Sequence, residues 1–101
     1  ATKIGHVGNG ILYKKTMPGV SPIFKLIKEE SGETWRNMFE TFNCGVGIDI
    51  VGEDDLEFQE ILKEVSSETN IKMYKRGICE QFEGDGNKVE LETPFGSFND
   101  Y

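Results

Sequence analysis

The sequence is poor in the residues from which metal centres and disulfide frameworks are built. Among 101 residues it holds one histidine, His6, and two cysteines, Cys44 and Cys79. Structural zinc sites draw on closely spaced cysteines and histidines, and disulfide scaffolds need more than two cysteines. We therefore expect no metal site, and we predict two free, buried thiols in a cytoplasmic protein.

Long apolar runs and an excess of positive charge are also missing. No stretch is long and apolar enough for a transmembrane helix, and no secretory signal is recognisable. The formal net charge is −7 and the pI about 4.7, which disfavours contact with the phosphate backbone of nucleic acids. We expect neither a membrane nor a nucleic acid among the partners.

Three local features have a chemical and a structural interpretation. A catalytic triad would have to use His6, which lies in a glycine-rich loop, so none is expected. The glycines of residues 5–10 faintly resemble a phosphate loop, but they precede a strand and not a helix, which favours a turn. The acids of residues 53–55 could hold Mg²⁺, but they are more simply the first turn of a helix.

The composition that is present supports one modest core. Hydrophobic residues make up 37% of the chain and aromatic residues 11%, with seven phenylalanines. This is too apolar for a disordered segment despite 29% charged residues. We expect residues 1–101 to form a single domain with a tail at residues 93–101.

The charges are unevenly distributed along the chain. Residues 29–101 hold all eighteen acids and six basic residues. Residues 1–28 hold no acid and five lysines, namely Lys3, Lys14, Lys15, Lys25 and Lys28. Such a basic arm could attract a phosphorylated substrate, but a solvated lysine-rich edge is the simpler interpretation.

Capping signals and apolar stripes predict three helices. Ser21-Pro22 opens the first, which Ser31-Gly32 closes. The second begins near Glu33-Thr34, and the third runs from the acids after Gly52 to Asn70. Two stripes at helical spacing are expected in the core: Trp35, Met38, Phe39 and Phe42 in the second helix, and Phe58, Ile61, Leu62 and Val65 in the third.

Apolar alternation predicts four strands, at residues 11–15, 46–51, 71–79 and 88–92. The order is therefore β-α-α-β-α-β-β. It favours an α/β (α+β) fold with helices packed on a mixed sheet. Pro94 ends the last strand. The tail that follows contains Phe95, Phe98 and Tyr101, and it could fold back onto the core or stay loose.

The segment Met38–Ile48, MFETFNCGVGI, is the most specific motif in the chain. It closely resembles the M-[FY]-x-x-F-N-x-G-[IV]-G-M signature of phosphoribosylformylglycinamidine cyclo-ligases, the aminoimidazole ribonucleotide synthetases. Supporting resemblances lie at residues 22–27, 74–79 and 83–86, so that the likeness covers residues 10–92. Three features depart from the pattern: Ile48 in place of Met, Asp49 in an otherwise apolar strand, and the tail from Thr93.

The resemblance implies a two-domain enzyme of purine biosynthesis. In that family an N-terminal domain binds ATP and Mg²⁺ and forms the dimer, and a C-terminal α/β domain completes the cleft for the ribonucleotide. ATP activates the formyl oxygen of the substrate, and the neighbouring nitrogen closes the imidazole ring. This chain resembles only the latter part of the C-terminal domain. We therefore expect a C-terminal piece or split subunit that is inactive and binds no ATP without its N-terminal partner.

Within the motif, Asn43, Gly45 and Gly47 are the candidate substrate-binding residues. The Asn43 amide can donate and accept hydrogen bonds, and the two glycines let a ligand approach the backbone. The competing interpretation is a helix cap with glycines that only permit tight packing. Cys44 stands at a variable position of the signature, so a nucleophilic role is not expected. No catalytic residue is identified.

Two other functional classes remain open. One is a binding or regulatory module that kept the fold without the chemistry. The other is a kinase or synthetase of the same superfamily, such as thiamine-phosphate kinase or selenophosphate synthetase, against which the F-N-x-G-x-G pattern argues. If the chain is instead a piece of the cyclo-ligase, the absent first part of the C-terminal domain leaves an apolar face and a sheet edge uncovered. We then expect a homodimer of the isolated chain, unless residues 94–101 fold back over the gap.

Overall fold

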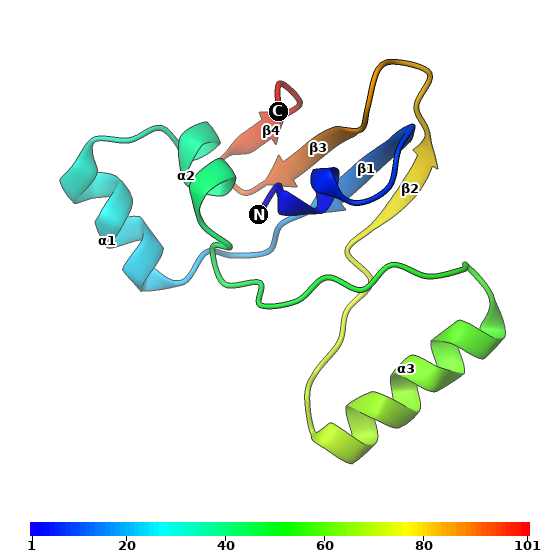
Figure 1. Ribbon diagram of the computed structural model, residues 1–101. Helices are drawn as coiled ribbons and strands as arrows, with labels where there is room; N and C mark the ends of the chain where they lie inside the picture. Colours follow the sequence, from blue (N-terminus) through cyan, green and yellow to red (C-terminus); the bar gives the residue numbers. More distant parts are fainter.

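The computed structural model describes residues 1–101 as three α-helices and a four-stranded mixed sheet (Figure 1). The sheet has the strand order β2-β1-β3-β4. No helix is long and apolar enough to cross a membrane. The elements along the chain are a 3-10 helix η1 (Lys3–His6), β1 (Ile11–Thr16), α1 (Pro22–Ser31), α2 (Trp35–Thr41), α3 (Leu56–Thr69), β2 (Gly77–Gln81), β3 (Lys88–Thr93) and β4 (Gly96–Phe98).

The sheet is built around β1, which pairs with two strands from the far end of the chain. It runs parallel to β3, with Tyr13 opposite Val89, and antiparallel to β2, with Tyr13 opposite Cys79. Successive side chains point to opposite faces of a strand. Tyr13 and Val89 therefore face the core, whereas Lys14 and Glu90 share the other face, which is polar.

The core lies between the sheet and the elements η1 and α2. Phe39 of α2 is 0% exposed, and Met38 beside it is also buried. Trp35 and Phe42 are half-buried, so the stripe predicted for this helix faces the core. The other buried apolar side chains are Tyr13, Met17, Val20, Cys44, Val89 and Leu91.

The predicted helix ends are confirmed to within a few residues, but Ser21 makes no side-chain cap hydrogen bond and the acids of residues 53–55 precede α3 instead of forming its first turn. Pro22 is the first residue of α1, and Gly32 ends it in the left-handed conformation. The side chain of Thr34 accepts a hydrogen bond from the Asn37 N–H at the start of α2. At α3, Asp55 accepts from the Phe58 N–H at 2.8 Å, so this acid of the 53–55 cluster is a helix cap.

Two strand predictions are wrong in whole or in part. Residues 46–51 form no strand, and the strand predicted at residues 71–79 begins only at Gly77. The observed order is β-α-α-α-β-β-β. A strand exists only beside a neighbour that completes its backbone hydrogen bonds, and residues 46–51 pair with neither edge strand, β2 or β4. Cys79 is exposed, so the prediction of two buried thiols holds only for Cys44.

The third helix does not pack on the sheet, contrary to the predicted architecture. Figure 1 shows α3 set apart, joined by two extended segments. Phe58 and Leu62 are half-buried, and the Phe58 ring lies against the backbone of Gly52. Ile61 and Val65, from the same predicted stripe, are exposed. Half of the apolar stripe of α3 is therefore open to solvent.

The C-terminal tail folds back onto α2. Its residues 96–98 form β4, a short strand that the sequence analysis did not predict, antiparallel to β3. Beyond it, the Tyr101 hydroxyl donates to the Arg36 carbonyl at 2.8 Å. Of the two conformations left open for the tail, the structure has the folded-back one.

Candidate functional site

The three candidate substrate-binding residues lie in one turn at the end of α2. The Phe42 N–H closes the helix on the Met38 carbonyl at 2.9 Å, and Phe42 itself is extended. The chain then turns through Asn43 and Cys44 before it leaves the core. The motif therefore forms a compact helix-to-coil turn, which we call the Asn43–Gly47 turn.

Asn43 holds this turn together through its own oxygens. Its side-chain Oδ1 accepts from the Gly45 N–H at 2.9 Å, and its carbonyl accepts from the Val46 N–H at 3.1 Å. This is the local side chain-to-backbone bond typical of Asn in turns. The side chain is exposed, and its Nδ2 donates no hydrogen bond within the chain. The amide acceptor is thus used by the fold, and the amide donors are free.

Cys44 is a structural residue of the turn. Its φ is 51°, its side chain is buried, and its thiol donates to the Met38 carbonyl at 3.7 Å. Burial raises the pKa of the Cys44 thiol. A protonated, inaccessible thiol is a poor nucleophile. The geometry therefore agrees with the expectation that Cys44 plays no nucleophilic part.

The two glycines of the turn differ in what the fold requires of them. Gly45 has φ 107°, and a Cβ there would lie 3.0 Å from the Ser21 Oγ. Gly47 has no positive φ, and a Cβ there would meet nothing within 4 Å. The positive φ requires glycine at position 45, and Ser21 leaves little room for a side chain there, whereas nothing within this chain requires glycine at position 47.

The lysines of residues 1–28 do not gather into one basic site. Lys15 is 7% exposed and forms an ion pair of 2.6 Å with Asp49. Its neighbour Lys14 points to the opposite face of the sheet and pairs with Glu80 at 3.0 Å. The pair between Lys15 and Asp49 ties the segment after the Asn43–Gly47 turn to β1. It also gives Asp49, which departs from the cyclo-ligase signature, a structural partner.

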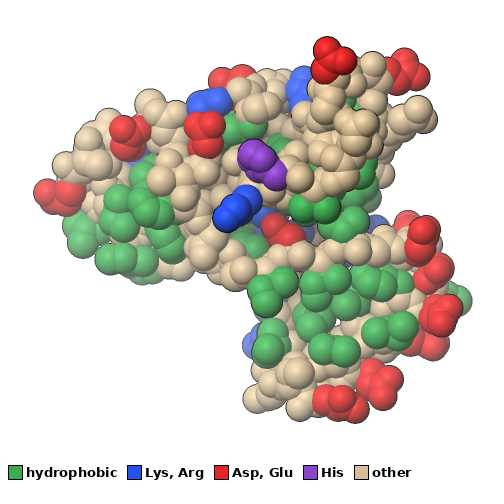
Figure 2. All heavy atoms as spheres, in the orientation of Figure 1, with side chains coloured by type: hydrophobic (Ala, Val, Ile, Leu, Met, Phe, Trp, Pro, Cys, Tyr) green, Lys and Arg blue, Asp and Glu red, His purple; other side chains and the backbone are tan.

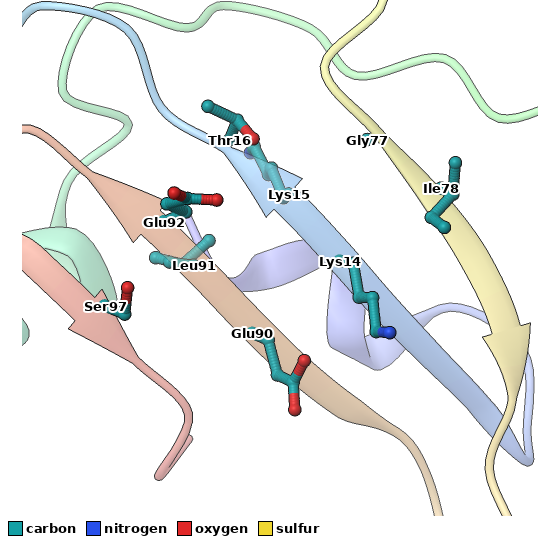
Figure 3. A pocket seen from close by; sticks show the side chains of 9 residues that line it. All are labelled: Lys14, Lys15, Thr16, Gly77, Ile78, Glu90, Leu91, Glu92 and Ser97. Atoms are coloured by element: carbon teal, nitrogen blue, oxygen red, sulfur yellow. The ribbon is translucent and has the colours of Figure 1, made fainter.

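The polar face of the sheet carries a hollow of about 370 Å³ that sequence reasoning missed. Figure 3 shows side chains of β1, β2, β3 and β4 around it. Lys14 stands between the carboxylate of Glu90 and the apolar side chain of Ile78, so the lining has no single charge. None of the three candidate residues lines this hollow. Only the pairing of strands far apart in sequence creates it, which local patterns do not reveal.

No protein-family profile matches the chain. Curated proteins do. A Methanococcus maripaludis strain C6 protein, "Phosphoribosylformylglycinamidine cyclo-ligase", is 30% identical over 98 residues, which are 96% of this chain and 28% of the relative. A protein of the same name from Caldicellulosiruptor saccharolyticus is 39% identical over 66 residues, 64% of this chain and 18% of the relative. The chain is homologous to phosphoribosylformylglycinamidine cyclo-ligases. It spans less than a third of the length of the cyclo-ligases that it matches.

The homology confirms the resemblance drawn from Met38–Ile48 and extends it. The motif resemblance covers residues 10–92, whereas the match to the M. maripaludis cyclo-ligase takes in 98 residues. Nearly the whole chain therefore shares ancestry with one section of a longer cyclo-ligase polypeptide.

Proposed function

We propose that the chain is the C-terminal portion of an ATP-dependent phosphoribosylformylglycinamidine cyclo-ligase, inactive alone. The whole enzyme would close the imidazole ring of formylglycinamidine ribonucleotide in purine biosynthesis. The observation that carries the proposal is homology over 96% of this chain to only 28% of a named cyclo-ligase. We assign ATP binding, catalysis and the homodimer contacts to the portion of that polypeptide that this chain does not match.

The ATP and Mg²⁺ site belongs to that remaining portion, because this chain offers no phosphate cradle. The glycine-rich residues 5–10 lead into β1 and not into a helix whose N–H groups would hold phosphate. Lys14 and Lys15 are engaged by Glu80 and Asp49. We therefore expect calorimetric titration of the isolated chain with Mg-ATP to give no heat of binding. A dissociation constant in the micromolar range would contradict this assignment.

The part we propose for this chain is contact with the ribonucleotide substrate through the Asn43–Gly47 turn. The Nδ2 donors of Asn43 are free and exposed, so they can bind the oxygen atoms of a sugar, phosphate or formyl group. The absence of a side chain at Gly47 leaves the backbone open to close approach. Both features are what a backbone-lined wall of a substrate cleft requires.

A chimera tests the proposal. The M. maripaludis cyclo-ligase would keep its own sequence except for the matched section, which this chain replaces. We expect formylglycinamidine ribonucleotide-dependent release of ADP and phosphate from the chimera and none from the isolated chain. A folded chimera that binds the ribonucleotide but closes no ring would instead favour the binding or regulatory module.

Two substitutions in the chimera separate substrate contact from packing. Asn43→Asp keeps an oxygen for the Gly45 N–H but replaces the amide donors with a carboxylate. Gly47→Ala adds a methyl group where the isolated chain has open space. We expect each to raise KM for the ribonucleotide at least about tenfold, the effect of about 1.4 kcal/mol of lost binding, with no change in Tm.

Gly19→Ala is the matched control, because a Cβ at Gly19 also meets nothing within 4 Å and its φ is not positive. This control should change neither KM nor Tm. Equal effects of the substitutions at Gly19 and Gly47 would argue that Gly47 is not at the substrate.

A further inference from the structure

The segment between the Asn43–Gly47 turn and β2 carries most of the exposed large hydrophobic side chains. Eight of the thirteen large hydrophobic residues that are exposed lie between Ile48 and Tyr74. Ile48 is 81% exposed, Leu56 75% and Tyr74 67%. Figure 2 shows apolar side chains massed on the visible face of the lower part of the molecule, where Figure 1 places α3. We call these side chains the Ile48–Tyr74 surface.

The backbone beside this surface, at residues 47–52, also makes no backbone hydrogen bonds. Residues 47–52 are extended between the turn and α3, and no N–H or C=O among them makes a backbone hydrogen bond within the chain. Their sequence alternates as a strand does, through Val46, Ile48 and Ile50. A strand-like segment with open hydrogen-bonding groups is a template for an added strand. The segment thus has the pattern of a strand but pairs with no strand of this chain.

The charge around the surface decides whether a second copy of this chain or a different polypeptide segment covers it. Residues 48–74 contain eight acids and two lysines, and Figure 2 shows acidic side chains at the rim of the apolar face. Two copies of this chain joined through this surface would bring two acidic rims together, which opposes association. The favoured occupant is a different polypeptide segment that is apolar at its centre and basic at its edge.

We infer that the Ile48–Tyr74 surface is the docking site for the part of the cyclo-ligase polypeptide that the match leaves out, which adds a strand beside residues 47–52 and covers α3. The relatives are long enough to supply a further segment, since this chain matches only 28% of the M. maripaludis protein. The inference rests on the proposed function. It also has a consequence for the site: because residue 47 ends the turn and begins the extended segment 47–52, docking would fix the Asn43–Gly47 turn from its outer side.

Hydrogen exchange of the cyclo-ligase chimera, compared with the isolated chain, tests this docking. In the isolated chain the amides of residues 48–52 should exchange at the rate of unstructured peptide, since none is hydrogen-bonded. In the chimera they should exchange at least about 100-fold more slowly, as amides of a paired strand do. Exchange in the chimera as fast as in the isolated chain would overturn the inference.

Ile48→Lys and Leu26→Lys form the matched pair of variants. Both side chains are exposed and apolar, but Leu26 lies on α1, outside the Ile48–Tyr74 surface. In the chimera, Ile48→Lys should abolish the slow exchange of residues 48–52, and Leu26→Lys should preserve it. Equal behaviour of the two variants would contradict docking at this surface.

If the chimera does not fold, this chain can be co-expressed with the remaining cyclo-ligase polypeptide, which carries an affinity tag. Co-purification that Ile48→Lys prevents and Leu26→Lys permits would support the inference. Failure of the chimera together with no co-purification would overturn it. A homodimer formed through this surface would also overturn the inference. It would be recognised if the dimer persists in the chimera and Ile48→Lys dissociates it, because a second copy would then cover the surface.

The two proposals can fail separately in the same chimera. Slow exchange of residues 48–52 without ring closure would support the docking surface and contradict the catalytic proposal. Ring closure with fast exchange of these amides would support the catalytic proposal and contradict the docking surface.

Discussion

The indole of Trp35 in α2 lies parallel to the ring of Phe95 in the tail, with 3.9 Å between the ring centroids and 4° between the planes. Phe98, from the same tail, packs near Phe39 of α2, with ring centroids 6.1 Å apart. Aromatic contacts of this kind add stability beyond the area that they bury. The tail is therefore a strap that holds α2 against the sheet, and with it the helix that leads into the Asn43–Gly47 turn.

Phe95→Ala should lower the free energy of unfolding by about 1–2 kcal/mol, since it removes the stack on Trp35 but leaves a position that is already partly exposed. Urea unfolding measures the change. Val7→Ala, at an exposed side chain outside the strap, serves as the control and should stay within about 0.5 kcal/mol of the parent chain. If both substitutions cost the same, the strap contributes nothing specific.

Phe39→Ala should cost about 3–5 kcal/mol, because the ring is fully buried between α2 and the sheet and its removal leaves a cavity. Chemical denaturation followed by far-UV circular dichroism reports the loss. Leu26→Ala on the exposed side of α1 provides the comparison. A loss below about 1 kcal/mol at Phe39 would mean that this stripe of α2 is not core.

The ion pair between Lys15 and Asp49 should show strong coupling in a double-mutant cycle. Asp49→Ala leaves the Lys15 ammonium with only the Ala1 carbonyl, 3.0 Å away, in a site that is nearly closed to water. We expect this change to cost about 1–3 kcal/mol.

Lys15→Met with Asp49→Ala removes both charges, and the double variant should lie within about 1 kcal/mol of the parent chain. Additive losses across the cycle would show that the two side chains do not interact in solution.

Stability should fall between about pH 10 and pH 12 through Tyr101. Burial raises the pKa of Tyr101 to about 12 from the ordinary value of 10.0. Between these values the folded chain keeps a proton that the unfolded chain has released, so the free energy of unfolding decreases as pH rises.

Tyr101→Phe should flatten this decrease when unfolding is measured across the same pH range. Loss of the hydrogen bond to Arg36 lowers stability by a constant amount, so the slope is the diagnostic quantity. Part of the slope should remain, because burial also raises the pKa of Tyr13. If the slope of stability against pH is unchanged in Tyr101→Phe, the Tyr101 hydroxyl is exposed to water in the folded chain.

Local signals predicted the helices because their causes lie within a few residues. The caps at Thr34 and Asp55 and the left-handed Gly32 and Asn70 act inside single turns, and the structure has all of them. The strand predicted at residues 46–51 failed for the opposite reason. Its alternation is genuine, but a strand also needs a neighbour, and residues 46–51 pair with no strand of this sheet.

The candidate site was predictable only in part for the same reason. The F-N-x-G-x-G pattern located the turn, and Asn chemistry anticipated its hydrogen bonds. The sequence did not reveal that glycine is required at 45 but not at 47, because the positive φ at 45 and its contact with Ser21 exist only in the folded turn. The three-residue β4 also escaped prediction, since so short a segment carries no periodic pattern.

The central position of β1 has a consequence for the order of folding. Both neighbours of this strand come from the last quarter of the chain, with Leu12 paired to Glu80 on one side and to Lys88 on the other. Closing such distant contacts costs chain entropy before any pairing repays it, which slows folding. During synthesis, β1 leaves the ribosome long before either neighbour exists. The nascent chain must therefore keep β1 without either partner until β2 and β3 have emerged, and the sheet forms late in the synthesis of this segment.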